Sequence, residues 1–196
     1  MKINIMYAIT EENMIVLAGA SASGKTEVAK MLAKKYGIIK AITTTTRNKR
    51  VGEVDGRDYF FVSKEQFETM LRQDRFVEHT IYNGNYYGST KEQIGQNKCI
   101  VIDPAGLRSY IGLNSPYIVT FYLEAKEETR FQRMLDRGDD KDLAKSRLEH
   151  DRIAFLDEKI PDVNFRINSE TQNIEEVADE IVRLYNEELK KRHLIK

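Results

Sequence analysis

The chain has 196 residues, a length that suits one domain with a substantial hydrophobic core. Charged residues make up 32% of it and their charges sum to zero, so no overall field favours nucleic acid or an anionic membrane as a partner. With one cysteine, no long apolar run and no apolar signal segment, we expect no disulfide framework and no membrane span, and we expect a cytoplasmic protein.

The first part of the chain reads as a strand and a helix joined by a glycine-containing turn. Residues 1–13 fit either an extra edge strand or a loose arm. The apolar run 14–18 favours a buried parallel strand, and residues 27–36 carry apolar side chains at helical spacing. We expect Gly37 to end this helix in a left-handed conformation.

The turn between them fits the phosphate-loop pattern, in which two glycines bracket four residues ahead of Lys-Thr. Its residues are Gly19, Ala20, Ser21, Ala22, Ser23, Gly24, Lys25 and Thr26. Glycines let backbone N–H groups approach phosphate oxygens, and the helix N-terminus adds partial positive charge. The pattern predicts that Lys25 bridges the β- and γ-phosphates and that the Thr26 hydroxyl holds Mg²⁺. A plain helix cap is the simpler interpretation, but the flanking strand and helix favour the phosphate site.

Residues 41–97 predict a small inserted α+β lobe. Residues 41–50 are β-branched residues followed by a cationic cluster, in which Arg47 and Arg50 suit a phosphate clamp, with solvated charge as the simpler interpretation. The aromatic run 59–62 predicts a strand, and Ser63 is placed to cap the next helix.

A hairpin follows in the same lobe. Residues 76–87 alternate along a strand and turn at Asn83-Gly84, which is a strong hairpin signal. Glu78, Tyr59 and Tyr87 are therefore available to line a pocket. A carboxylate exposed on a strand is the simpler interpretation of Glu78.

The second half of the chain returns to the core. Cys99 lies in an apolar run and is expected to be a core residue, and this strand ends at Asp103 as a Walker B strand does, where a carboxylate supports Mg²⁺. Residues 117–123 predict another buried strand. A charge-rich helix–loop–helix begins near residue 127 and carries Arg137 and Arg147, which fits a mobile lid or, more simply, a solvated helix pair.

The chain closes with one more strand and a helix. Residues 163–168 predict the strand, with Asn168 at its end. Asn173 and Glu176 fit a capping box at the start of the last helix, whose apolar stripe includes Val177 and Ile181.

This order of elements resembles guanylate kinase from about residue 13 onward. The most specific segments are 45–62, 76–79 and 84–89. The resemblance implies an α/β fold with a P-loop three-layer parallel-sheet core, an inserted α+β lobe for a nucleoside monophosphate and a helical lid. It divides a single domain, 1–196, into a core at about 1–40, 98–130 and 158–196, a GMP-binding lobe at about 41–97 and a lid at about 131–157.

The resemblance also implies roles for individual residues. Those that grip the phosphate of GMP are Arg47, Arg50, Tyr59 and Tyr87. Those that read the guanine are Glu78, Ser89 and Thr43, with Asp103 beside them or in the magnesium shell. The catalytic cations are Lys25, Arg47, Arg137 and Arg147, with Arg133 as a helper, and Asn168 lies near the donor adenine.

The chain departs from the family pattern at three places. The phosphate loop has Ala20 and Ala22 where the family has Pro and Gly, and Asn48-Lys49 separates the two clamp arginines where Pro precedes the second one. The family strand ends in Asp-x-Asp. Here either Val101 replaces the first Asp, or a short deletion makes Asp103 the first and removes the second, so one carboxylate is missing.

These features predict an enzyme that transfers the γ-phosphoryl group of MgATP to GMP, and to dGMP, in purine nucleotide metabolism. Its expected cofactor is Mg²⁺ and its partners are ATP and GMP, with neither nucleic acid nor membrane, as a monomer or a homodimer. Two alternatives stay open at this point: a guanylate-kinase-like scaffold module without catalysis, and a related kinase with another phosphorylated acceptor.

Overall fold

The computed structural model describes residues 14–82, 84–95 and 97–195. The edge strand or arm predicted for residues 1–13, and Asn83 of the predicted hairpin turn, lie outside the described residues.

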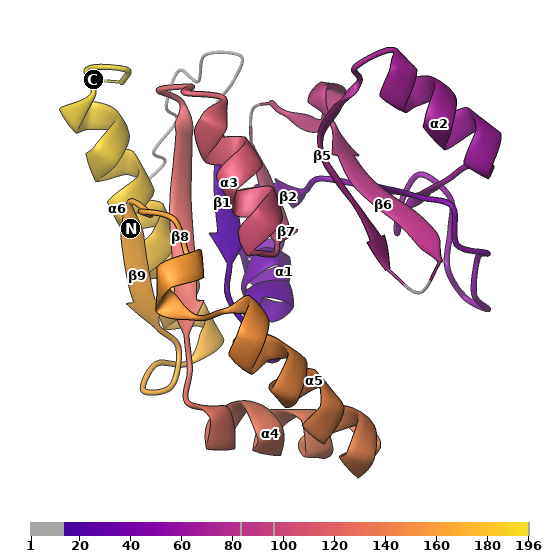
Figure 1. Cartoon of the computed structure of the whole chain (residues 1–196). Coiled ribbons are helices and arrows are strands. Elements are labelled where there is room, and N and C mark those ends of the chain that lie inside the picture. Colours follow the sequence, from indigo (N-terminus) through magenta and orange to yellow (C-terminus); the bar gives the residue numbers. More distant parts are fainter. Residues whose placement is uncertain (1–13, 83, 96, 196) are drawn as a thin grey trace.

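A five-stranded parallel sheet forms the core, in the strand order β2-β7-β1-β8-β9 (Figure 1). Its strands are β1 Met14–Ala18, β2 Ile39–Lys40, β7 Lys98–Ile102, β8 Ile118–Glu124 and β9 Phe165–Asn168. The central strands are apolar runs because helices bury both faces of the sheet. Strand β2 was not predicted, since it is only two exposed residues long at the sheet edge.

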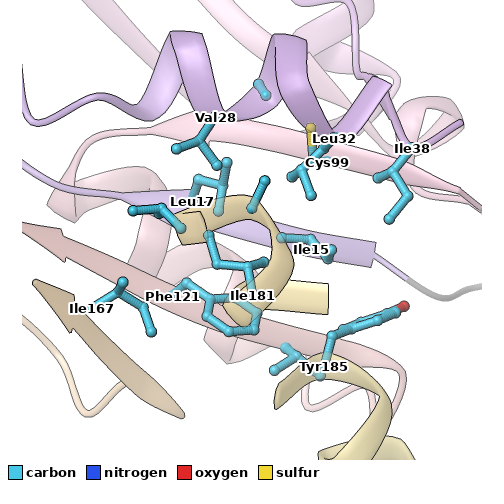
Figure 2. Close-up of a cluster of buried hydrophobic side chains, with 14 of the residues drawn as sticks. Ile15, Leu17, Val28, Leu32, Ile38, Cys99, Phe121, Ile167, Ile181 and Tyr185 are labelled. Atoms are coloured by element: carbon cyan, nitrogen blue, oxygen red, sulfur yellow. The ribbon is translucent and has the colours of Figure 1, made fainter. Parts of the chain in front are cut away.

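Alternate residues of β1 point to opposite layers of helix. Ile15 and Leu17 pack with α1 (Lys25–Tyr36) and α6 (Ile174–Lys191), as Figure 2 shows, while Val16 packs on the other side with α3 (Pro104–Gly112). The three-layer α/β fold class predicted from the sequence is therefore confirmed.

The predicted ends of the first and last helices are confirmed. Gly37 caps α1 with φ at 69°, a left-handed conformation that glycine adopts without penalty. Asn173 and Glu176 form the capping box of α6, in which each side chain binds the other residue's backbone N–H. Cys99 is fully buried, and burial raises the pKa of its thiol to about 12, as fits a core residue.

Helix α3 was missed at the sequence level. Asp103 is its N-cap and Pro104 its first residue, and Asp103 Oδ1 accepts the Gly106 N–H at 2.8 Å. An N-cap Asp followed by Pro is a helix-start signal, so the sequence did carry the information.

A second, mixed sheet lies beside the core, in the order β4-β3-β6-β5 (Figure 1). Its strands are β3 Thr44–Thr45, β4 Phe60–Phe61, β5 Phe76–Tyr82 and β6 Asn85–Thr90. β5 and β6 form the predicted antiparallel hairpin, and a short 3₁₀ turn, η1 (Lys91–Gln93), leads back to the core.

Helix α2 (Lys64–Arg72) packs on this second sheet. Ser63 and Gln66 form a capping box, as the sequence predicted for Ser63. The Phe67 ring is fully buried and stacks at 4.3 Å from the Phe76 ring and 5.1 Å from the Tyr86 ring, between centroids. These rings form a small core of their own for the lobe.

Two helices, α4 (Glu127–Asp136) and α5 (Lys141–Ala154), follow β8 and lie beyond the carboxyl ends of the core strands (Figure 1). The predicted helix pair is confirmed. Met134, Ala144 and Leu148 hold it together in a small apolar cluster, and a short turn, η2 (Asp157–Lys159), returns the chain to the core. Among the helices of the described ranges, we find none with the length and apolarity needed to cross a membrane.

Candidate active site

A cleft of about 550 Å³ lies between the phosphate loop, the second sheet and the start of α3. It brings together segments that are far apart in the sequence. The predicted site residues that line it are Gly19, Ser21, Lys25, Thr43, Tyr59, Glu78, Tyr87 and Asp103. Donor-side and acceptor-side candidates therefore share one cavity.

Backbone geometry explains the glycines of the phosphate loop. Gly19 has φ at 147°, and a Cβ there would lie 2.5 Å from the Leu123 carbonyl oxygen, so no other residue fits. Gly24, the N-cap of α1, has φ at 97°. Ala22 has φ at 58°, a left-handed conformation that costs an L-residue about 1–2 kcal/mol. Ala22, one of the two alanines that depart from the family pattern, is thus held in a strained conformation.

The Lys25 side chain binds back to the start of the phosphate loop. Its Nζ donates to the carbonyl oxygens of Gly19 at 2.5 Å and Ala20 at 2.7 Å. Burial lowers the pKa of Lys25 to about 8, with Asp151 opposing that shift and Arg130 adding to it. Lys25 therefore remains largely protonated at neutral pH, as binding of a polyphosphate requires.

One acidic corner of the cleft is built around Glu78. Ser89 donates to Glu78 Oε1 from its backbone N–H at 2.9 Å and from its hydroxyl at 2.7 Å, and the buried Tyr110 hydroxyl donates to Ser89 Oγ at 3.2 Å. Burial raises the pKa of Glu78, the Ser89 hydrogen bonds lower it and the neighbouring Asp103 raises it. Ser89 itself is fully buried behind the glutamate.

Asp103 belongs to this corner. It lines the cleft, its charge acts on Glu78, and its side chain caps α3 at Gly106. A Cβ on Gly106 would lie 3.4 Å from Glu78 Cγ, so the start of α3 packs closely against that side chain. Asp103 and Glu78 are therefore neighbours on one side of the cleft.

A cationic corner lies in the second lobe. The Arg47 guanidinium lies 5.4 Å from the centre of the Tyr59 ring, and the Tyr59 and Tyr87 rings are 6.2 Å apart between centroids. Glu53 binds both terminal nitrogens of Arg47, at 2.7 and 3.0 Å, and accepts the Arg50 N–H at 2.8 Å. Glu53 was not among the predicted site residues, yet it holds the Arg47 guanidinium through both terminal nitrogens.

The predicted lid arginines lie outside the cleft. Arg137 and Arg147 are exposed and share one oxygen of Asp139, at 2.5 and 3.2 Å, and neither is among the described residues that line the cleft. Arg133 instead donates to the Ala22 carbonyl at 3.3 Å and the Ser169 carbonyl at 2.6 Å, so α4 already contacts the phosphate loop.

Two further predicted residues are not among the described residues that line the cleft. Thr26 is exposed in the first turn of α1. Asn168 is exposed at the end of β9, where its Oδ1 accepts the Glu170 N–H at 2.8 Å, and it lines a separate hollow beside α4. The cleft lining also includes residues that the sequence analysis did not select. These are Thr80, Gly88, Val101, Ile102, Pro104, Ala105, Arg108, His150, Asp151, Ala154, Phe155 and Lys159.

Comparison with known proteins identifies the family of this chain. The family model described as guanylate kinase matches residues 11–186. The chain belongs to the guanylate kinase family. The resemblance inferred from the sequence is thereby confirmed, and the activity of this family is the phosphorylation of GMP by an ATP-dependent kinase.

Individual relatives agree with the family assignment. The chain is 37% identical over 144 residues to the guanylate kinase of Clostridium perfringens (strain 13 / Type A), covering 68% of this chain and 67% of the relative. It is 30% identical over 185 residues to that of Anaplasma phagocytophilum (strain HZ), covering 89% and 86%. The crystal structure of guanylate kinase from Anaplasma phagocytophilum shares the fold, with a TM-score of 0.62 at 24% identity over 97% of this chain and 100% of that chain.

Proposed function

We propose that this guanylate kinase family member transfers the γ-phosphoryl group of ATP to GMP, and also to dGMP, in this cleft, with the side chains that line it and those on the loops and helices around it. The observation that carries the proposal is that Lys25 of the phosphate loop and Glu78 of the second lobe line the same cavity. We assign the reaction to the cytoplasm, as the composition predicts, and we divide the chain into core, GMP-binding lobe and lid at the boundaries given above.

The donor half consists of the phosphate loop, 19–26. Its backbone N–H groups and the start of α1 favour the ATP phosphates, and Lys25 neutralises charge on the β- and γ-phosphates. Asn168 lies at the end of β9, on the side where we place the adenine.

Magnesium fits the donor half. Within the described ranges, no group of three or more His, Cys, Asp or Glu side chains forms a ready metal site, and Mg²⁺ is commonly held by substrate phosphates with few protein ligands. The Thr26 hydroxyl is the ligand we propose, and the ion would neutralise charge on the transferring group. Asp103, beside Glu78, is less well placed for this role.

The acceptor half reads the guanine through Glu78. A carboxylate accepts hydrogen bonds from the guanine N1–H and 2-amino group. Adenine lacks both donors, so it would satisfy this largely buried carboxylate less well, leaving it only the two hydrogen bonds from Ser89. The Ser89 hydroxyl already donates its proton in a hydrogen bond to Glu78 Oε1. We therefore give Ser89 the role of orienting Glu78, and Thr43, whose side chain lines the cleft, the role of donor to guanine O6.

Cations hold the reacting phosphates. Arg47, Arg50, Tyr59 and Tyr87 form the clamp for the GMP phosphate, and Arg137 and Arg147 reach the transferring group when the lid closes. The attacking phosphate oxygen is already anionic, so no general base is needed, and positioning and charge neutralisation supply the catalysis. Closure also excludes water and so limits ATP hydrolysis.

An acceptor screen tests the proposal. ADP release is measured for the pure protein with ATP and Mg²⁺ against GMP, dGMP, AMP, CMP and a ribose phosphate, with Lys25→Ala as the control for a contaminating kinase. We expect turnover with GMP and dGMP that Lys25→Ala abolishes. Faster turnover with a sugar phosphate would support a different acceptor, and no turnover with any acceptor would support a scaffold module.

A further inference from the structure

The lid helix α5 contributes a buried carboxylate to the phosphate loop. Asp151 and Ser21 are 130 residues apart, yet the Ser21 N–H donates to Asp151 Oδ2 at 2.8 Å and the Ser21 hydroxyl donates to Oδ1 at 3.2 Å. Only 5% of the Asp151 side chain is exposed. None of the roles assigned above uses this residue.

Arg130 of α4 completes the contact. Its Nη1 donates to Asp151 Oδ2 at 2.8 Å and to the Ser21 carbonyl at 3.3 Å, so both backbone groups of Ser21 are bound by this pair. The Arg130 side chain is 9% exposed, and its buried Nε has no hydrogen-bond partner among the described residues. Both lid helices are thereby attached to one residue of the loop.

Stability alone does not account for this pair. A buried ion pair must lose its hydration, and replacing such a pair with apolar side chains is often neutral or stabilising. Asp151 and Lys25 line the same cleft, and the negative charge of Asp151 opposes the loss of the Lys25 proton. The pair thus lies where it affects both the shape and the charge of the phosphate loop.

We propose that Asp151, held by Arg130, is a positioning residue for the donor nucleotide: it fixes Ser21 so that the phosphate loop is preshaped for the ATP triphosphate. This inference rests on the proposed function, because it takes ATP as the donor. If the Arg130–Asp151 pair stays on the phosphate loop, the part of the lid that moves is the part farther from the loop than this pair. Arg137 and Arg147, about half exposed at 49% and 52%, are on that outer part.

If Asp151 instead blocked the loop, its removal would have the opposite effect on ATP binding. A carboxylate that blocks the loop would occupy a phosphate-binding N–H and would have to leave when ATP enters. Asp151 is buried and bonded on both sides, by Arg130 and by Ser21, which favours a permanent support. Positioning predicts weaker ATP binding when the carboxylate is neutralised, and blocking predicts tighter binding.

The test is Asp151→Asn, which keeps the shape and removes the charge. We expect KM for ATP to rise about tenfold, the usual effect of losing a charge-assisted hydrogen bond, while KM for GMP stays within about twofold. Asp142→Asn is the matched control, because Asp142 is on the same helix with 92% of its side chain exposed. An unchanged or lower KM for ATP in Asp151→Asn, or an equal rise in both KM values, overturns the proposal.

A second variant separates positioning from folding. Arg130→Met combined with Asp151→Asn removes both buried charges, so we expect the protein to fold with a thermal midpoint near that of the wild type. KM for ATP is still expected to be raised, because Ser21 has lost its carboxylate. Recovery of the wild-type value would show that the single variant suffered only from an unpaired Arg130, and would overturn the proposal.

A binding measurement separates this inference from the proposed function. The rise in thermal midpoint caused by ATP with Mg²⁺, and separately by GMP, is recorded for the wild type and both variants. We expect the variants to lose much of the ATP-induced rise and to keep the GMP-induced rise. The inference is overturned if the variants keep both the ATP-induced and the GMP-induced rise. A wild type that binds ATP but turns over no GMP contradicts the proposed function alone.

Discussion

Ser89 donates two hydrogen bonds to a single oxygen of Glu78, one from its backbone N–H at 2.9 Å and one from its hydroxyl at 2.7 Å. Tyr110 donates to the same hydroxyl from the core side. The orientation of the proposed guanine-reading carboxylate is therefore fixed by a short chain of hydrogen bonds that ends in the hydrophobic core.

Neutralising Glu78 tests its part in recognition. We expect Glu78→Gln to lower kcat/KM for GMP about 100-fold, because an amide cannot accept two charge-assisted hydrogen bonds from the guanine. KM for ATP is expected to stay the same. Glu92→Gln is the control, since Glu92 pairs with Arg75 on the surface. Equal losses for GMP and ATP would remove Glu78 from guanine recognition.

The raised pKa of Glu78 predicts a pH dependence of stability. A carboxyl group whose pKa is higher in the folded than in the unfolded protein adds stability at low pH, and this contribution is lost as the pH rises through the folded-state pKa. Relative to the wild type, Glu78→Gln is therefore expected to gain thermal stability as the pH rises above the ordinary pKa of a glutamate, about 4.3. Thermal midpoints of both proteins across this range provide the check, and a constant difference would contradict it.

Tyr110→Phe tests the hydrogen-bond chain behind Glu78. Removal of one buried hydroxyl keeps the ring packing, and loss of a neutral hydrogen bond of about 1 kcal/mol predicts a rise of about fivefold in KM for GMP. Tyr185→Phe changes another buried tyrosine, which lies on α6 in the hydrophobic core, and it is expected to leave KM for GMP unchanged. The idea is contradicted when both variants have the same KM.

Arg47→Met tests the phosphate clamp. We expect kcat/KM for GMP to fall about 100-fold or more, because a planar guanidinium that can bind two phosphate oxygens is lost. Arg57→Met is the matched control in the same loop, where Arg57 is 65% exposed and pairs with Asp58. Steady-state kinetics with varied GMP decides the matter, and a comparable loss in Arg57→Met would indicate a general effect of charge.

Ala22→Gly tests the strain in the phosphate loop. Since glycine adopts the left-handed conformation of residue 22 freely, we expect the free energy of unfolding to rise by about 1 kcal/mol. Ala33→Gly, inside α1, is expected to lower it by about 1 kcal/mol. Urea unfolding measures both, and a loss of stability in Ala22→Gly would show that the alanine methyl group is needed where it is.

Local patterns allowed much of the fold to be predicted. The phosphate loop lies between β1 and α1, and the caps at Ser63 and Asn173 form with residues three positions away. Such contacts depend on neighbours in the chain, so the sequence contains them directly. Helix α3 belongs here as well, because Asp103-Pro104 marks its start although the sequence analysis passed over it.

The cleft, and the side chains that hold its lining residues in place, depend on the tertiary structure. Nothing in the sequence around Glu78 indicates that Asp103 lies beside it. The contact between Ser21 and Asp151 joins residues that are 130 positions apart in the sequence. The sequence by itself predicted the candidate residues for phosphate from a local pattern, and the candidate residues for guanine from its resemblance to a family. Only the packing of lid, lobe and core decided which side chains hold them in place, because a contact between distant residues leaves no local pattern.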